Sequence, residues 1–555
     1  MRSQFPLLVL VACAGEGGEV VVPASAVTAL EISPTSTTVN TSPDEAATVQ
    51  YLATATFEDG TRAEIDLVSW SLSNFAAGTI DADGLFTAST ENGAITTVVA
   101  EHAGVSAEAE LTVVYGDVID ESDGAASVDD FAGAATGVVQ WLYPPDGVAV
   151  PRNIPSLSFM WEPLSGATAY RLSFTTAITT VYLITTETTA TVDGATWQTI
   201  AATNAGGEVA VEVRALAGDA LAASATRSVT VNRLDAFGSI YYWSTSDAGI
   251  VKVPIDAVEP ELYYAPNLNA PNCVACHVVR EDRMGVAYGI EGELKFYTGI
   301  VDISGSEPVE LTTRDRVGYY STLDPDGKKM LTSDETGVLS LWDATTGAFV
   351  RQTSVADTIL TQPDWSPDGT QIVAVAAKQM YGDCCFVEGK LVLVPIDDDG
   401  NLGAITTLYE PEYDYANTLN VYYPSFSPDG KWVAFNMAKG SGYDNAEAAL
   451  YVISASGGEP IELAAANQGA GLTNSWPHWG PLPDDEVFWL AFASKRTYGN
   501  LVNYGEDDPM AWQSQIWVTA FRPATAEQGL DPSAPAFWLP NQDAVTSNHT
   551  TYWGP

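Results

Sequence analysis

Hydrophobic and polar positions alternate along this chain in short runs. Such runs occupy residues 53–57, 109–114 and 209–215, and Gly, Asp, Asn and Pro separate them from their neighbours. Alternation with a period of two places successive side chains on opposite faces of a β-strand, and no long stretch shows the 3.6-residue period of a helix. We therefore predict an all-β protein. Its repeats and its resemblances to known domains imply two β-sandwich domains followed by a six-bladed β-propeller.

The C-terminal half contains a repeat. Residues 365–374 read W-S-P-D-G-T-Q-I-V-A, residues 426–435 read F-S-P-D-G-K-W-V-A-F, and looser copies lie at 323–331 and 479–496. Pro and Asp-Gly close a tight reversal after one strand, and each copy is followed by further strand-like runs, so every unit supplies about four strands. The repeat resembles the TolB-type β-propeller, which implies this fold for residues 236–555.

The end of the chain predicts how the propeller closes. Residues 548–555 repeat the W-G-P ending of residues 474–481, so the chain stops after one inner strand. That strand needs outer partners, and the runs at 241–243 and 250–253 can provide them. Pairing the two ends of the propeller removes its open edge and gives about six blades.

Two further domains are expected before the propeller. The run at 79–88, T-I-D-A-D-G-L-F-T-A, resembles the turn of bacterial Ig-like domains of group 2, and this likeness covers residues 25–115. Residues 138–235 resemble a fibronectin type III sandwich with Trp161 and Tyr170 in its core. The acidic, Gly- and Ala-rich stretch between them, 116–137, reads as an extended linker.

The first residues indicate export. Residues 1–24 form a signal peptide and tether, in which a short charged start precedes an apolar run and the lipobox L-V-A-C ends at Cys13. This resembles bacterial lipoprotein signals and implies lipid on the Cys13 thiol and an outer-membrane location, on the periplasmic or the cell-surface side. An ordinary secretory signal with an incidental Cys is the alternative.

Charge limits the partners. The chain has 71 Asp and Glu against 23 Lys and Arg, a formal net charge of -48, which repels nucleic acid and anionic headgroups. The membrane contact is therefore through the lipid alone, and a basic redox protein or another cytochrome would be attracted. Asp397, Asp398 and Asp399 could hold calcium through carboxylate oxygens, although such a run is more typical of a solvated hairpin turn.

The strongest chemical motif is C-x-x-C-H at Cys273, Cys276 and His277, in a chain with only 5 Cys and 4 His. Two thiols at this spacing can form thioethers to one porphyrin, and the next imidazole can bind the iron, so the motif predicts one covalent haem c. Zinc would need four ligands, and the chain has no second C-x-x-C and no H-x-x-x-H motif. A thioredoxin-like site would need a βαβ setting. The remaining pair, Cys384 and Cys385, could form a vicinal disulfide, but a rigid loop or two separate thiols is favoured.

The repeat also suggests a second iron ligand. Residues 278–288 align without gaps with 425–435, which puts His277 at the place of Pro363 and Pro424 in an innermost strand near one mouth of the channel. Closure through the C-terminus would bring His549 alongside, and we expect it to be the distal ligand. The alternatives are His478, which flanking aromatic residues could equally bury, and Met284, in the turn beyond His277.

Together these features favour a lipid-anchored, mono-haem c-type cytochrome that carries electrons, with the β-sandwiches as spacers. A binding, scaffold or sensor propeller with a structural haem is the alternative. A peroxidase-like enzyme is a smaller option, because the chain has no H-E-x-x-H or G-x-S-x-G motif and an enzyme would need an open iron position.

Overall fold

The computed structural model describes eleven stretches of the chain, and β-strands dominate all of them. The stretches are 26–192, 194–218, 220–265, 274–289, 295–381, 386–412, 419–443, 445–469, 473–481, 486–502 and 513–554. The predicted signal peptide with Cys13 lies outside the described residues, as do Cys273, Cys384 and Cys385. The chain divides into two compact units, Met1–Val113 and Val114–Pro555.

The first unit is a β-sandwich with its own core. Its strands are β1 (Val27–Ser33), β2 (Ser36–Thr41), β3 (Thr48–Gln50), β4 (Leu52–Phe57), β5 (Arg62–Glu64), β6 (Ser69–Leu72), β7 (Gly78–Ile80), β8 (Leu85–Ala88), β9 (Ala94–His102) and the first part of β10 (Val105–Asp120), with a 3-10 turn η1 (Phe75–Ala77). The D-A-D-G turn joins β7 to β8: Asp81 accepts from the backbone N–H groups of Asp83 and Leu85, and Gly84 has the positive φ that the turn needs.

The stretch expected to be an extended linker is ordered. The last residues of β10 pair in parallel with β16 (Thr179–Thr185), and a short 3-10 helix, η2 (Val128–Phe131), follows. Phe131 is fully buried against Ala169 and Ile184. The acidic side chains lie on the outside, while the Phe131 ring holds the segment against the sandwich. The acidic composition of the segment therefore did not indicate that it is folded.

The second unit begins with another β-sandwich. Its elements are β11 (Gly137–Val138), β12 (Trp141–Tyr143), β13 (Val148–Val150), β14 (Ser158–Trp161), β15 (Ala169–Thr175), β16, β17 (Thr189–Thr191), α1 (Gly194–Thr203), β18 (Glu208–Ala217), β19 (Ala220–Ala223) and β20 (Arg227–Val231). Trp161 and Tyr170 are buried, as predicted. The helix α1, which the alternating pattern did not predict, buries Trp197 in the same core.

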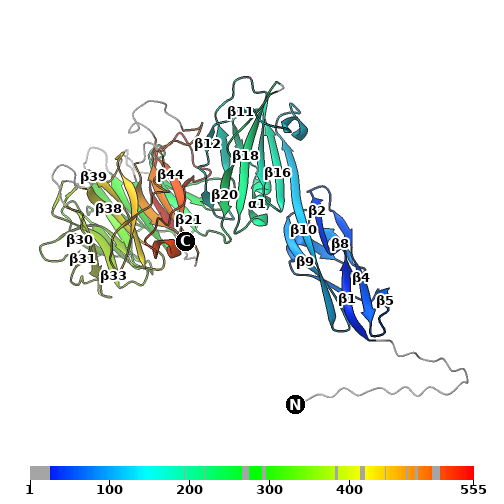
Figure 1. Cartoon of the computed structure of the whole chain (residues 1–555). Coiled ribbons are helices and arrows are strands. Elements are labelled where there is room, and N and C mark those ends of the chain that lie inside the picture. The colour runs from blue at the N-terminus through cyan, green and yellow to red at the C-terminus, as the bar shows by residue number, and fades with distance from the viewer. Residues whose placement is uncertain are drawn as a thin grey trace, which may run out of the picture. The chain divides into compact units, whose positions relative to one another are not determined.

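Six four-stranded antiparallel sheets follow within the described residues, and they form the blades of a propeller (Figure 1). The strands are given from the innermost outward. Blade 1 has β46 (Asn548–Gly554), β21 (Ser239–Ser244), β22 (Gly249–Pro254) and β23 (Glu261–Tyr264); blade 2 has β24 (Val274–Arg280), β25 (Arg283–Gly289), β26 (Phe296–Asp302) and β27 (Val309–Glu310); blade 3 has β28 (Tyr320–Leu323), β29 (Lys329–Ser333), β30 (Leu339–Asp343) and β31 (Ala348–Thr353). Blade 4 has β32 (Ile359–Trp365), β33 (Gln371–Ala377), β36 (Lys390–Pro395) and β37 (Thr406–Tyr409); blade 5 has β38 (Leu419–Phe426), β39 (Trp432–Lys439), β40 (Ala449–Ser454) and β41 (Ile461–Glu462); blade 6 has β42 (Ser475–Trp479), β43 (Phe488–Ser494), β44 (Gln515–Phe521) and β45 (Phe537–Trp538). A small hairpin, β34 (Gln379–Met380) with β35 (Phe386–Val387), extends blade 4, and a short helix, α2 (Pro523–Ala526), belongs to blade 6.

The propeller closes through its two ends, as predicted. The C-terminal strand β46 pairs antiparallel with β21, from Gly554 opposite Ser239 to Asn548 opposite Ser244. The innermost strands β24, β28, β32, β38, β42 and β46 each contact the next, and β46 contacts β24 again, which completes the ring. Closure leaves no open inner edge for another chain to pair with.

The S-P-D-G turns join the first two strands of blades 4 and 5. The Ser366 hydroxyl donates to Asp368 at 2.6 Å, and Ser427 donates to Asp429 at the same distance. Gly369 and Gly430 adopt φ values of +74° and +69°, in the left-handed region that glycine occupies at little cost. These turns explain why the repeat was readable in the sequence.

The second sandwich and the propeller share one hydrophobic core within the second unit. Tyr143 of β12 packs edge-to-face on Tyr498 of blade 6 with ring centroids 4.8 Å apart, and its hydroxyl accepts from the Trp538 backbone N–H at 3.0 Å. The Asn500 amide donates to the Trp161 carbonyl at 3.1 Å. The sandwich is therefore held to blade 6 by buried contacts.

Candidate functional site

The innermost strands carry a repeated backbone irregularity where they line the channel. A residue with positive φ stands at the same place in five of the described inner strands: Cys276, Gln362, Tyr423, Trp476 and Thr550. In each case the pairing register to the neighbouring strand shifts at this point. Such a bulge interrupts the alternation of faces, so consecutive side chains can line the same cavity.

Cys276 and His277 of the C-x-x-C-H motif occupy this bulge in blade 2. Proline follows the bulge residue in blades 4, 5 and 6, as Pro363, Pro424 and Pro477, and His277 follows Cys276 in the same place. Proline suits a bulge because it has no N–H to donate to the ladder. The position of His277 in the repeat, inferred from sequence alignment, thus coincides with its position in the folded strand.

The bulges surround a pocket at the centre of the channel, which we call the channel pocket. Its walls are formed by side chains from all six blades: Cys276, His277, Tyr320, Ser321, Gln362, Pro363, Asp364, Tyr423, Pro424, Trp476, His478 and Tyr552. The open space between these side chains is about 40 Å³, which is room for one or two water molecules. The pocket is therefore a packed constriction, and a larger group could enter it only if side chains moved.

His277 is the most unusual side chain of the channel pocket. It is 5% exposed, and neither of its ring nitrogens has a hydrogen-bond partner among the described residues. Burial lowers the pKa of His277 to about 4. The backbone of Tyr241 has a weaker effect that raises the pKa, but it forms no hydrogen bond with the ring. The imidazole is therefore neutral at pH 7 and keeps a nitrogen lone pair available, and an unsatisfied buried group of this kind costs about 1–3 kcal/mol.

Cys276 lies beside His277 on the wall of the same pocket. It is half-buried and packs against the aromatic cluster that includes Tyr320, Tyr423 and Trp476. Two of the three motif residues thus face one cavity, while Cys273 lies outside the described residues. A thiol and a neutral imidazole without a hydrogen-bond partner among the described residues are the donor types that a covalently attached haem requires, but the open space of about 40 Å³ does not hold a porphyrin in this arrangement of side chains.

His478 is the second histidine on the channel pocket. It lies two residues after the bulge residue Trp476, its ring centroid is 4.5 Å from that of Tyr552, and its Nδ1 is 3.4 Å from the Ser425 hydroxyl. Burial is the main cause that lowers its pKa to about 3, and the neighbouring His277 and the Arg280 guanidinium lower it further.

The structure places His549 elsewhere. It does not line the channel pocket as described, and both of its ring nitrogens hold hydrogen bonds, Nδ1 with the Tyr443 hydroxyl at 3.0 Å and Nε2 with the Ser547 hydroxyl at 2.7 Å. Its ring also packs against Trp243, and burial lowers its pKa to about 4. The prediction that closure would bring His549 opposite His277 therefore has no support in the side-chain positions.

Met284, the other alternative, is in the hydrophobic core. It belongs to β25 and is fully buried in a cluster with Val278, Val286 and Met330. Its pairing partner is Val279, two residues beyond His277. The sulfur is consequently part of the packing between blades and is absent from the described lining of the channel pocket.

Two polar residues of the channel pocket were not singled out by the sequence. Gln362 is 4% exposed; its amide oxygen accepts from the Tyr423 N–H at 2.8 Å, while its Nε2 has no partner among the described residues. Asp364 is 6% exposed, accepts from the Phe426 N–H at 2.7 Å, and burial raises its pKa to about 6. Their alignment with Cys276 and Val278 in the repeat was the signal that could have found them.

The remaining sequence-predicted sites are simpler. Asp397 closes a hairpin turn between β36 and β37, accepting from the backbone of Asp399 and Asn401 and from the Asn401 amide. Across the described residues, no group of three or more His, Cys, Asp and Glu is arranged to hold a metal ion. The described part of the chain likewise holds no helix with the length and hydropathy that a membrane crossing requires.

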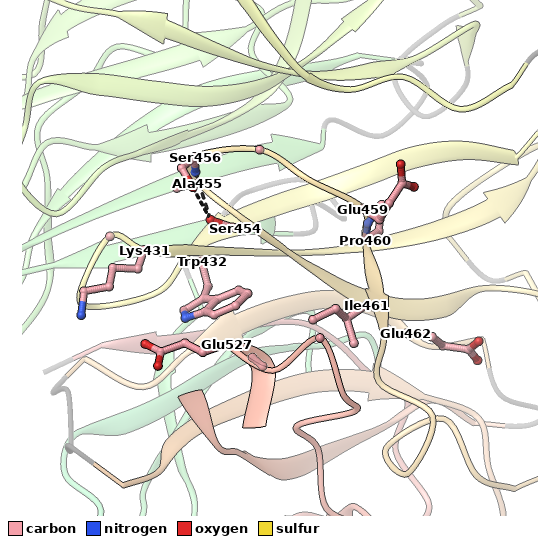
Figure 2. Close-up of a pocket in the computed structure, with 14 residues that line it drawn as sticks. Lys431, Trp432, Ser454, Ala455, Ser456, Glu459, Pro460, Ile461, Glu462 and Glu527 are labelled. Carbon is pink, nitrogen blue, oxygen red and sulfur yellow. Dashed lines mark hydrogen bonds between the residues drawn. The ribbon is translucent and has the colours of Figure 1, made fainter. Parts of the chain in front are cut away.

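A cavity larger than the channel pocket lies outside the channel. It is a groove of about 1000 Å³ on the rim of the propeller, between the outer strands of blade 5 and the helix α2 of blade 6 (Figure 2). No His or Cys belongs to its described lining, so the motif chemistry has no counterpart there.

No protein-family model matches the chain, and no curated protein matches it in sequence. Among solved structures, the chain is similar to TolB from Acinetobacter baumannii, with 14% identity, a TM-score of 0.36 and coverage of 63% of this chain and 79% of that one. It is also similar to a chain of the nidogen/laminin complex (12% identity, TM-score 0.36, 57% and 97% covered) and to one of Kuenenia stuttgartiensis hydrazine synthase (15%, 0.31, 44% and 70%). At these identities the propeller assignment rests on the strand pairing described above.

Proposed function

We propose that the chain is a mono-haem c-type cytochrome that transfers electrons, with its haem attached to Cys273 and Cys276 and its iron bound by His277. One observation carries the proposal: inside a C-x-x-C-H motif, the His277 imidazole is buried with both nitrogens unpartnered among the described residues, on the same pocket as Cys276. A structural histidine of that burial would ordinarily hold a hydrogen bond. A metal ligand needs the free lone pair instead.

The bound haem would supply a one-electron iron couple, and the protein would set its ligands and surroundings. Burial keeps His277 neutral, which is the form that binds iron. The rings of Tyr320, Tyr423 and Trp476 line the cavity and would restrict water at this side. Because the open space is small, attachment of a macrocycle would require these rings to shift.

We further propose His478 as the second axial ligand, in place of His549. His478 shares the channel pocket with His277, and its one hydrogen bond is a long one, at 3.4 Å. His549 would have to give up two shorter hydrogen bonds and leave its place beside Trp243. Two imidazole ligands would make the iron low-spin and lower its potential relative to a His/Met pair.

The cellular setting completes the proposal. A lipid on Cys13 would hold the mature chain at the outer membrane, and the Ig-like and fibronectin-like sandwiches would act as spacers. With a net charge of -48, the surface would favour a basic redox protein or a cytochrome with a basic face. Calcium at Asp397–Asp399 is a lesser possibility within this setting, since Asp397 already accepts three hydrogen bonds in its own turn.

A second candidate, a sensor or peroxidase-like haem protein, is favoured by one observation. Gln362 directs an unpartnered amide donor onto the same pocket, and Asp364 adds a carboxyl. If His478 did not bind the iron, these groups could hold a small ligand at the open position. The number of strong axial ligands therefore separates the two functions.

The test is expression of the full chain together with a cytochrome c maturation system. We expect one covalent haem per chain by haem stain and pyridine haemochrome. Cys276→Ser should shift the haemochrome band towards that of a single thioether, and His277→Ala should reduce covalent loading about tenfold. Cys384→Ser and His102→Ala are the matched controls. A wild-type chain without covalent haem, or a His277→Ala variant loaded like wild type, would refute the proposal.

A further inference from the structure

The rim groove of Figure 2 has the features of a binding site and is separate from the channel chemistry. It lies beside β41, the outermost strand of blade 5, and opposite α2 of blade 6. Its volume of about 1000 Å³ is at the upper end of the range for ligand sites. Nothing in the haem motif or the channel pocket accounts for it.

The floor of the groove is apolar and aromatic. Trp432, which begins β39, packs edge-to-face on Phe521 of blade 6 with centroids 5.7 Å apart, and Ile461, Pro460 and Ala526 line the walls beside it. Trp432 is 7% exposed, yet its indole Nε1 has no hydrogen-bond partner among the residues that the structure describes. The Nε1 atom itself is buried, so an occupant of the groove would meet the ring of Trp432 and not this donor.

The rim of the groove is acidic. Glu459, Glu462 and Glu527 are exposed, and none of them forms an ion pair within the described ranges. The groove's single cation, Lys431, lies 3.6 Å from Asp429 and is neutralised by it. Figure 2 shows Glu459 and Glu462 along the β41 side and Glu527 below Trp432, so carboxylates stand on both sides of the aromatic floor.

Three turns border the groove. Gly430, Gly457 and Gly529 close them with positive φ values, and their amides donate within the turns to the carbonyls of Ser427, Ser454 and Ala526. Main-chain contact with an occupant at these turns would therefore be made through carbonyl oxygens, to which an extended peptide can donate its backbone N–H groups.

We propose that this groove docks an extended segment of a partner protein that carries Lys or Arg side chains on either side of a small apolar residue. The cations meet the unpaired carboxylates, the apolar residue covers the exposed part of the Trp432 ring, and backbone N–H groups of the segment donate to carbonyls of the bordering turns. This inference does not depend on the proposed haem function, because no groove residue belongs to the channel pocket.

The test titrates the full chain with the probe acetyl-Ala-Lys-Val-Lys-Ala-amide and with its counterpart in which Glu replaces both Lys. The variant Glu459→Gln/Glu462→Gln removes two rim charges. Its matched control is Glu259→Gln/Glu261→Gln, which removes two exposed carboxylates at the corresponding outermost strand of blade 1. Calorimetry gives the affinities, and tryptophan emission in wild type and Trp432→Phe reports whether the indole is involved.

We expect the Lys probe to bind and the Glu probe not to bind. The rim variant should weaken binding by about fivefold or more, and the control variant by less than about twofold. Trp432→Phe should abolish the change in emission. Equal weakening in both double variants would show non-specific attraction to an acidic surface and overturn the proposal. Absence of binding at millimolar probe would overturn it too.

Discussion

Tyr423 and Trp476 stack face to face on the wall of the channel pocket, with ring centroids 3.9 Å apart and planes inclined by 16°. They come from neighbouring inner strands, β38 and β42, and each is the bulge residue of its strand. Cys276 occupies the equivalent place in β24. The same β-bulge that places the Tyr423 and Trp476 rings on the channel pocket therefore also places Cys276 there.

The two candidate distal ligands can be separated by single substitutions. We expect His478→Ala to convert the low-spin iron of the loaded protein to high spin, because its ring lies on the channel pocket with His277. His549→Ala should leave the low-spin bands in place, since its nitrogens are engaged with Tyr443 and Ser547. Absorption and electron paramagnetic resonance spectra distinguish the outcomes. High-spin iron in His549→Ala alone would reverse the assignment.

Closure by the last strand should dominate the stability of the propeller. Trp553 of β46 is buried in the shared core, and its indole donates to the Phe237 carbonyl at 2.9 Å. We expect Trp553→Ala to lower the free energy of unfolding by about 3–5 kcal/mol, measured by urea denaturation. Val545→Ala, an exposed site just before β46, should change it by less than about 0.5 kcal/mol. Similar losses in the two variants would contradict this role of β46.

The bulge should be strained where its residue is β-branched. Thr550 has a φ of +46° and is buried with its hydroxyl unpartnered among the described residues, while Thr551 does not have a positive φ. Thr550→Ala keeps a Cβ at the left-handed position and Thr550→Gly removes it, while both variants lose the same unpartnered hydroxyl. We therefore expect Thr550→Gly to be about 1 kcal/mol more stable than Thr550→Ala by urea denaturation. Equal stabilities would mean that the left-handed position carries no measurable strain.

Histidine burial should make the haem-free protein sensitive to mild acid. Burial lowers the pKa of His549 from 6.5 to about 4, so the unfolded chain binds this proton more readily. The corresponding stability is fully present above pH 6.5 and is lost as the pH falls through about 4, and it amounts to roughly 3 kcal/mol. Asp364 acts in the opposite sense: its pKa, raised to about 6, costs stability as the pH rises through that value.

This dependence is testable through its slope. The unfolding free energy falls as the pH drops from 6.5 to about 4, and His549→Phe should make this fall smaller. The slope should correspond to about one fewer proton taken up on unfolding, whatever the effect of the variant at neutral pH. Tyr443→Phe is the control, because it removes one hydrogen bond to the ring and keeps the titrating group. An unchanged slope in His549→Phe would show that this ring does not titrate in the assumed range.

Much of the architecture was readable because its signals are local. Alternation sets a strand over four to eight residues, and Pro, Asp and Gly set a turn within four, so the blades and the S-P-D-G reversals could be predicted from short windows. The W-G-P ending of Trp553, Gly554 and Pro555 even predicted the pairing of β46 with β21. The prediction of an extended linker at residues 116–137 did not anticipate the folded segment there, because one buried ring, Phe131, outweighed an acidic composition.

The site divides in the same way. The motif falls in phase with the repeat, so the sequence alone placed Cys276 and His277 together on an innermost strand. That His478 shares their pocket, and that His549 bonds to Tyr443 and Ser547, became apparent in the folded chain. A one-residue bulge changes which side chain faces the channel, and the groups that meet across the channel depend on all six strands at once.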